Sequence, residues 1–123
     1  MRWADATSWL GRRVLVTGAS GFIGAAVCEL LLECGAEVHG THRSSLPPRD
    51  IIAHPAYLPG DAESLLERVR PEVVFHLASP INLGRDPALY PVMRAGILDA
   101  TAAIAAGCAR LGIRLLHVGT CAE

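Results

Sequence analysis

Apolar positions recur along the chain with two different periods, and the two periods alternate. Short runs rich in β-branched residues predict strands at residues 13–16, 36–41, 72–77 and 113–118, with a weaker one at Tyr57-Leu58. Apolar positions at helical spacing predict helices over residues 22–34 and 61–69, and a long alanine-rich helix from about Pro91 to a stop at Gly112. Residues 44–55 hold three of the eight prolines and are predicted to form a loop with at most a short helical turn.

This alternation of strands and helices predicts a single α/β domain. Right-handed crossovers between consecutive strands give a doubly wound parallel sheet, the Rossmann arrangement, most simply in the order 3-2-1-4-5. The apolar run at residues 72–77 is typical of a strand covered on both faces. The 123 residues fit one such domain, and the sequence contains no internal repeat or linker.

Three glycines, Gly18, Gly21 and Gly24, stand between the first predicted strand and the first predicted helix. The first permits a sharp turn, the second lets the backbone approach a pyrophosphate, and the third lets the helix lie tightly against the strand. The N-terminus of the helix offers N–H groups and a positive dipole end to the phosphates. The sequence therefore predicts a dinucleotide site, with a tight turn that binds nothing as the alternative. The expected backbone donors lie at Ser20, Gly21, Phe22 and Ile23.

The end of the second predicted strand bears on which dinucleotide is bound. A site for NAD needs a carboxylate there to accept hydrogen bonds from the ribose 2′-hydroxyl, and the sequence has none. His42 occupies the expected acidic position, and Arg43 follows where it can pair with a 2′-phosphate. The sequence thus favours NADP, with NAD as the alternative cofactor and a solvated surface role as the alternative for Arg43.

The composition limits the possible partners. Hydrophobic residues make up 51% of the chain, and the net charge is −1 with the basic residues scattered, which gives no reason to expect nucleic acid. No apolar run approaches the roughly 20 residues that a membrane span needs, and the first residues lack an apolar secretory core, so we expect a cytoplasmic protein without membrane contact. Cys28, Cys34, Cys108 and Cys121 are expected to be small buried hydrophobes, and no metal site is expected.

Four short motifs resemble, in order and spacing, those of the extended short-chain dehydrogenase/reductase family, which includes NAD(P)-dependent nucleotide-sugar epimerases, dehydratases and 4-ketoreductases. The resemblance covers residues 10–123. The motifs are Thr17-Gly18-x-x-Gly21-x-x-Gly24, Gly60-Asp61, His76-Leu77-Ala78 and Val118-Gly119-Thr120.

The resemblance implies specific roles for the later motifs. It assigns Thr120 the catalytic hydroxyl that polarises the substrate oxygen, and it gives His76 structural support. The alternatives are a helix cap for Asp61 and an ordinary strand position for Thr120. Cofactor contacts are assigned to Asp61, Ala62, Leu77, Ala78 and Ser79.

The sequence also departs from the family pattern. Cys121-Ala122 stands where the dehydratases carry acidic residues, so elimination of water lacks its placed acid and a ketoreductase or epimerase is favoured. The short string at residues 119–123 is most similar to that of nucleotide-sugar 4-ketoreductases. The stretch 94–97 lacks the Asn-Gly-Thr that the family often carries in the long helix.

The family's proton donor is a Tyr in Tyr-x-x-x-Lys, and these 123 residues contain no lysine. We therefore expect residues 1–123 to be the partial NAD(P)-binding Rossmann domain of a larger nucleotide-sugar enzyme, inactive alone, with nucleotide sugar bound only by a full-length form. A dinucleotide-binding module without chemistry and a truncated gene product are the alternatives. The resemblance and the apolar residues on both sides of the long helix also predict a homodimer.

Overall fold

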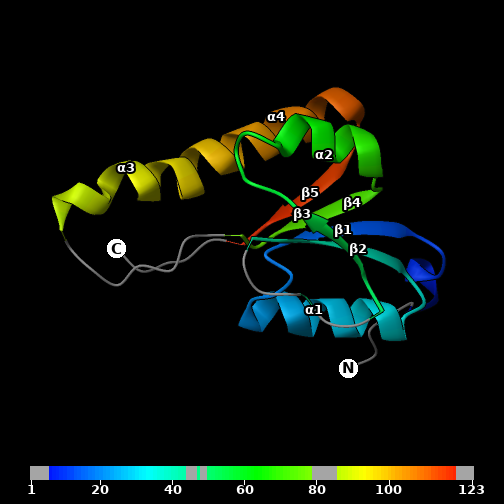
Figure 1. Cartoon of the computed structure of the whole chain (residues 1–123). Coiled ribbons are helices and arrows are strands. Elements are labelled where there is room, and N and C mark those ends of the chain that lie inside the picture. The colour runs from blue at the N-terminus through cyan, green and yellow to red at the C-terminus, as the bar shows by residue number, and fades with distance from the viewer. Residues whose placement is uncertain (1–5, 44–46, 48–49, 79–85, 119–123) are drawn as a thin grey trace.

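Five parallel strands form one sheet in the order β3-β2-β1-β4-β5 (Figure 1), as the sequence predicted. The computed structural model describes residues 6–43, 47, 50–78 and 86–118. The strands are β1 (Arg13–Thr17), β2 (Glu37–His42), β3 (Ile52–Pro55), β4 (Val73–His76) and β5 (Arg114–His117).

Helices cover both faces of this sheet (Figure 1). One face carries α1 (Phe22–Glu33), and the other carries α2 (Ala62–Val69) and α4 (Ala100–Leu111). A 3-10 turn, η1 (Ala6–Trp9), precedes β1. Three short segments lead into α4: η2 (Pro87–Leu89), α3 (Tyr90–Met93) and the π-helical η3 (Arg94–Asp99).

The hydrophobic core consists of two clusters, one on each face of the sheet. Successive residues of a strand point to opposite faces, so the central strand β1 contributes to both clusters. Leu15 packs with Leu66 and Ile104 beneath α2 and α4, whereas Val14 and Val16 pack with residues of α1. Residues 14–17 of β1 are buried, and the carboxyl end of the strand therefore lies between two helical layers.

The predicted stop of the first helix at Gly35 is confirmed. Gly35 has a φ of +81°, a left-handed conformation that favours glycine. Its N–H donates to Leu32 O at 3.0 Å, and the N–H of Ala36 donates to Leu31 O at 3.0 Å. These two bonds form a Schellman motif, which satisfies carbonyls at the helix end and directs the chain into β2.

The third strand is where the prediction is wrong. The structure places β3 at Ile52–Pro55, within the predicted loop, and Tyr57 and Leu58 lie after it. Within the described residues this strand pairs only with β2 and forms the sheet edge, so three of its four residues are exposed. Its apolar residues stop at His54-Pro55, too short a run to mark a strand. Its Pro55 is tolerated because it closes an edge strand.

The long helix begins at Pro87, four residues before the predicted start. By length and composition alone, the segment Pro87–Leu111 could cross a membrane, contrary to the expectation from the sequence. Its second half, α4, is the crossover between the neighbouring strands β4 and β5, and its Ile104 and Cys108 belong to the hydrophobic core. We therefore interpret α4 as a core helix. The first half contains no buried residue and projects beyond the sheet (Figure 1).

Candidate functional site

The glycine turn joins the carboxyl end of β1 to the N-terminus of α1. Gly18 has a φ of +71°, and a Cβ there would lie 3.0 Å from the backbone of Ala78. A Cβ at Gly24 would overlap the carbonyl oxygen of Gly18 and press on Ala19. Gly24 therefore permits close packing of the helix on the turn itself, rather than on the strand as the sequence suggested.

Two residues of β2, which no motif in the sequence marks, fix the glycine turn from the side. Thr41 accepts hydrogen bonds from the turn twice, from Gly18 N to its Oγ1 at 3.0 Å and from Ala19 N to its carbonyl oxygen at 3.0 Å. Gly40 is needed because a Cβ there would lie 2.5 Å from the Ala19 Cβ. The turn is thus held rigidly against the neighbouring strand.

The first turn of α1 presents backbone N–H groups at the carboxyl edge of the sheet. The helical ladder starts with Ala25 N, which donates to Gly21 O at 2.9 Å, so the N–H groups of Phe22 and Ile23 precede it. Gly21 N already donates to Gly18 O at 3.0 Å within the turn. Of the four predicted donors, Gly21 is therefore engaged inside the protein, while Phe22 and Ile23 lie where a helix N-terminus binds anions.

A cavity of about 1010 Å³ opens directly over this turn. It gathers most of the residues that the sequence predicted to contact the cofactor: Gly18, Ser20, Gly21, Phe22, Ile23, Gly24, His42, Arg43, Asp61, Leu77 and Ala78. Tyr57, Leu58 and Gly96 also line it, and the sequence did not select them. These three come from segments far from the glycine motif, and no local signal marks them.

Among the predicted site residues that the structure describes, Ala62 does not line the cavity. Ala62 is buried in the core, and its N–H donates to Pro59 O at 3.0 Å. Ser79 and Thr120 lie outside the residues that the structure describes.

A buried hydrogen-bond chain joins β1, β4 and α4 beneath the cavity. The N–H groups of Leu77 and Ala78 donate to Thr17 Oγ1 at 2.9 and 3.0 Å. Both lone pairs of this hydroxyl are then used, so its proton is donated to His76 Nδ1, 2.8 Å away. His76 must carry its own proton on Nε2, which faces Thr101 Oγ1 at 3.1 Å.

This chain holds His76 as a neutral imidazole. Burial lowers the pKa of His76, and the nearby His117 lowers it further. The side chain is 1% exposed and does not belong to the cavity lining. Its position agrees with the structural support that the resemblance assigned, because it locks the segment that carries Leu77 and Ala78.

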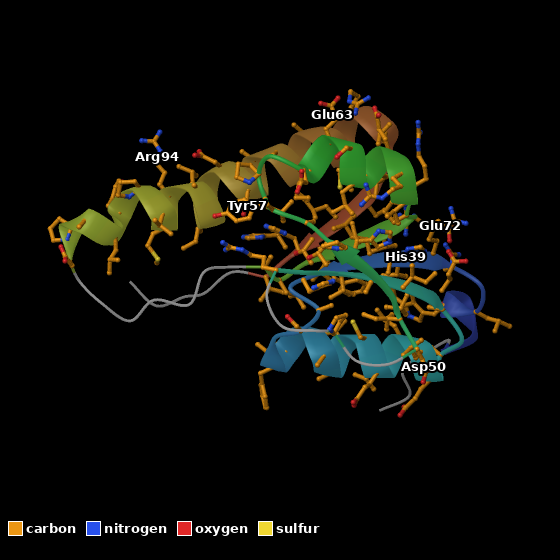
Figure 2. The ribbon with its side chains drawn as sticks, viewed as in Figure 1. His39, Asp50, Tyr57, Glu63, Glu72 and Arg94 are labelled. Atoms are coloured by element: carbon orange, nitrogen blue, oxygen red, sulfur yellow. The ribbon has the colours of Figure 1, made fainter. Side chains whose placement is uncertain are left out.

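Asp61 precedes α2 at the N-cap position but does not cap the helix with its side chain. Its Oδ2 instead accepts a hydrogen bond from Tyr57 N at 2.7 Å, while Asp61 N donates to Tyr57 O at 2.8 Å. The carboxylate therefore fixes the chain between β3 and α2 and also borders the cavity. Figure 2 shows Tyr57 at the carboxyl end of the sheet and Glu72 at the opposite end.

The end of β2 supplies the basic residues of the cavity. Arg43 follows β2, and its Cζ lies 4.3 Å from the centroid of the Tyr57 ring. His42 and Arg43 both line the cavity, and Asp61 is the one carboxylate among its lining residues within the described part of the chain. A nucleotide that carries a 2′-phosphate is electrostatically compatible with this wall of the cavity.

Two of the cysteines are buried thiols, as expected. Burial raises the pKa of Cys28 to about 11, and burial also raises the pKa of Cys108. Both thiols stay protonated at neutral pH and behave as small core residues. Cys34 is partly exposed, and Cys121 lies outside the described residues. Among the described residues, no group of three or more His, Cys, Asp or Glu side chains is arranged to hold a metal ion.

The chain is similar in sequence to several known proteins. The chain is 33% identical over 84 residues to UDP-glucose 4-epimerase of Mycolicibacterium smegmatis, covering 59% of this chain and 27% of that protein. It is 36% identical over 94 residues to cinnamoyl-CoA reductase 2 of Medicago truncatula, covering 65% and 27%. The chain thus spans about a quarter of the length of these relatives.

A solved structure shares the fold of this chain. The crystal structure of Thermus thermophilus UDP-glucose 4-epimerase in complex with NAD superposes with a TM-score of 0.74 at 25% identity, covering 84% of this chain and 36% of that one. The family model for the NAD dependent epimerase/dehydratase family matches residues 14–123, from β1 onward. The chain therefore belongs to the NAD-dependent epimerase/dehydratase family.

Proposed function

We propose that this chain is the NAD(P)-binding part of an oxidoreductase or epimerase that acts on nucleotide sugars by hydride transfer. The observation that carries the proposal is the cavity over the glycine turn, where the first-turn N–H groups of α1 meet residues from the ends of β2 and β4. Open α/β sheets bind their ligands at this carboxyl edge. The family and the relatives named above support the same assignment.

The residues of this cavity fit a nicotinamide dinucleotide. Gly21 is exposed, and a Cβ there would meet one protein atom, Gly18 O at 3.3 Å, and otherwise project into open space where a pyrophosphate can lie. Phe22 and Ile23 N–H groups face the phosphates, while Leu77 and Ala78 border the nicotinamide end. The bound dinucleotide supplies hydride transfer, and these residues bind and orient it.

We expect NADP(H) to bind more tightly than NAD(H). No carboxylate follows β2, and Arg43 lies in the cavity wall next to His42. Isothermal titration of the chain with both cofactors tests this preference. A lower dissociation constant for NADP(H) is expected, and equal or tighter binding of NAD(H) contradicts the preference.

A ketoreductase or epimerase is favoured over a dehydratase because Cys121-Ala122 replaces the acids that elimination needs. Thr120 is proposed as the hydroxyl that polarises the substrate oxygen. The UDP-glucose 4-epimerase relative supports a nucleotide-sugar substrate. We also propose that the protein is cytoplasmic. We propose further that it forms a homodimer through the long helix.

A dinucleotide-binding module without chemistry is the second candidate, favoured by the lack of lysine in these 123 residues. The family's Tyr and Lys supply general acid catalysis typically worth about 10²–10⁴-fold. We therefore expect no NADPH oxidation when the isolated chain is mixed with keto-sugar nucleotides. Robust oxidation that depends on such a substrate contradicts this expectation and identifies the chain as an enzyme by itself.

A further inference from the structure

The side chains of Arg43 and Tyr57 meet at the mouth of the cavity because β2 and β3 pair in parallel. The register places His42 opposite Pro55, and Ala56 N donates to His42 O at 3.2 Å. The residues just beyond these strands are thereby held next to each other. The Arg43 Cζ lies 4.3 Å from the centroid of the Tyr57 ring, well inside the range of a cation–π contact.

The backbone of Tyr57 is fixed even though its side chain is 63% exposed. Its N–H donates to Asp61 Oδ2 at 2.7 Å and its carbonyl oxygen accepts from Asp61 N at 2.8 Å, which closes a small ring of hydrogen bonds. A tyrosine loses little side-chain freedom when its ring forms a contact, since it has two rotatable angles. The Tyr57 ring is therefore a rigid surface for the Arg43 guanidinium that contacts it.

The charge of Arg43 remains available for a ligand. None of the ion pairs within residues 6–43, 47, 50–78 and 86–118 involves Arg43. A guanidinium stacked on a ring uses one face, and its N–H groups lie along the edge of the plane, free to donate to phosphate oxygens. The stack thus orients the donors without consuming them.

We propose that Tyr57 is a positioning residue for cofactor specificity: its ring holds the Arg43 guanidinium at the cavity mouth, in the orientation that binds the 2′-phosphate of NADP. The inference rests on the proposed NADP preference. Asp61 contributes indirectly, through the two hydrogen bonds that fix Tyr57. Without the ring, Arg43 samples many rotamers in solvent and loses part of its binding energy to conformational entropy.

The test compares two probes that differ only in the 2′-phosphate, adenosine 2′,5′-bisphosphate and adenosine 5′-monophosphate. Their affinities for the 123-residue chain are measured by isothermal titration, and the ratio is the readout, because general damage to the cavity weakens both probes. Tyr57→Leu is expected to lower the ratio by about two- to fivefold, the fold-change that corresponds to about 0.5–1 kcal/mol for an exposed cation–π contact. Tyr57→Phe keeps the ring and is expected to leave the ratio within about twofold.

Two arginine variants separate this inference from the proposed function. Arg43→Gln is expected to abolish most of the preference for the bisphosphate, and adding Tyr57→Leu to it is expected to change nothing further. Arg94→Gln is the matched control, because Figure 2 shows Arg94 on the side of the helix that points away from the sheet.

Each outcome is decisive. An unchanged ratio in Tyr57→Leu, with a reduced ratio in Arg43→Gln, overturns the role of Tyr57 and leaves the NADP preference standing. An unchanged ratio in Arg43→Gln overturns both the preference and the inference that rests on it. Failure of the parent chain to bind either probe overturns the proposed function itself. Circular dichroism melting curves verify that each variant is folded.

Discussion

The hydroxyl of Thr17 makes three hydrogen bonds, which is all that a hydroxyl can make. It therefore sets the proton position on His76 and holds the N–H groups of Leu77 and Ala78 at the edge of the cavity. The motif that contains Thr17 is readable from the sequence, but this role is not. It depends on β4 lying beside β1, which brings together residues about sixty positions apart.

Thr17→Val tests the importance of this hydroxyl. Valine has the same shape but leaves three partners unsatisfied, and each buried group without a partner costs about 1–3 kcal/mol. We expect the free energy of unfolding to fall by at least about 3 kcal/mol, measured by urea denaturation. Thr17→Ser keeps the hydroxyl and serves as the control, with an expected loss below about 1 kcal/mol. Equal stability of the valine variant and the parent contradicts the hydrogen-bond account.

At the scale of elements, strands with a recognisable apolar run were predictable, and the edge strand β3 was not. β1, β2, β4 and β5 were located to within one residue because each carries such a run, even though β5 is also an edge strand with three of its four residues exposed. β3 was missed because its apolar residues stop at His54-Pro55 in a proline-containing stretch, and its position follows from pairing with β2. The same difference between local and long-range signals explains which site residues were predicted. The glycine turn is local in sequence, whereas Thr41, Tyr57 and Thr101 join it only through the strand order.

A polar chain connects α2 to the edge of the sheet. Arg68 Nη2 faces His54 Nδ1 at 3.4 Å, the His54 Nε2 faces His39 Nδ1 at 2.9 Å, and His39 Nε2 faces Glu37 Oε2 at 2.9 Å. Since Arg68 only donates, His54 carries its proton on Nε2 and donates to His39, which donates to Glu37.

Stability should therefore depend on pH. Burial lowers the pKa of His76 and of His54 below the ordinary value of 6.5, and the nearby His39, Arg68 and His42 lower the pKa of His54 further. Below pH 6.5 the unfolded chain therefore binds more protons than the folded chain. The contribution of the two neutral histidines to the free energy of unfolding is complete above pH 6.5 and is lost as the pH falls. Urea denaturation at several pH values between about 8 and 5 measures the slope.

His54→Gln is the informative variant for this prediction. It removes one of the two histidines, so the loss of stability between neutral and acidic pH is expected to become smaller than in the parent chain. A parent whose stability rises or stays constant as the pH falls from 7 to 5 contradicts the prediction, because the sign follows from the two lowered pKa values.

At the scale of the whole molecule, the projecting helix leaves apolar side chains uncovered. Tyr90, Val92, Ile97 and Leu98 are between 42% and 68% exposed, and they lie on the part of the helix that extends beyond the sheet (Figure 1). Farther along the same helix, Ile104 and Cys108 are buried against the sheet. The exposed apolar part is of the kind that mediates association.

We expect the chain to self-associate at tens of micromolar, measured by sedimentation at several concentrations. Leu98→Glu places a charge on the exposed part of the helix and is expected to shift the distribution towards monomer. Leu30→Glu is the matched control, because Leu30 is also about half exposed but lies on α1, across the sheet. A strictly monomeric parent chain contradicts the prediction.

The central claim is that a nicotinamide dinucleotide binds over the glycine turn. Backbone amide NMR of the labelled chain, titrated with NADP, tests this claim directly, with Gly21→Val as the comparison. We expect the largest shifts at residues 18–24, at Arg43 and at Tyr57, and no binding by a folded Gly21→Val variant. Absence of shifts at these residues, or parental affinity in Gly21→Val, contradicts it.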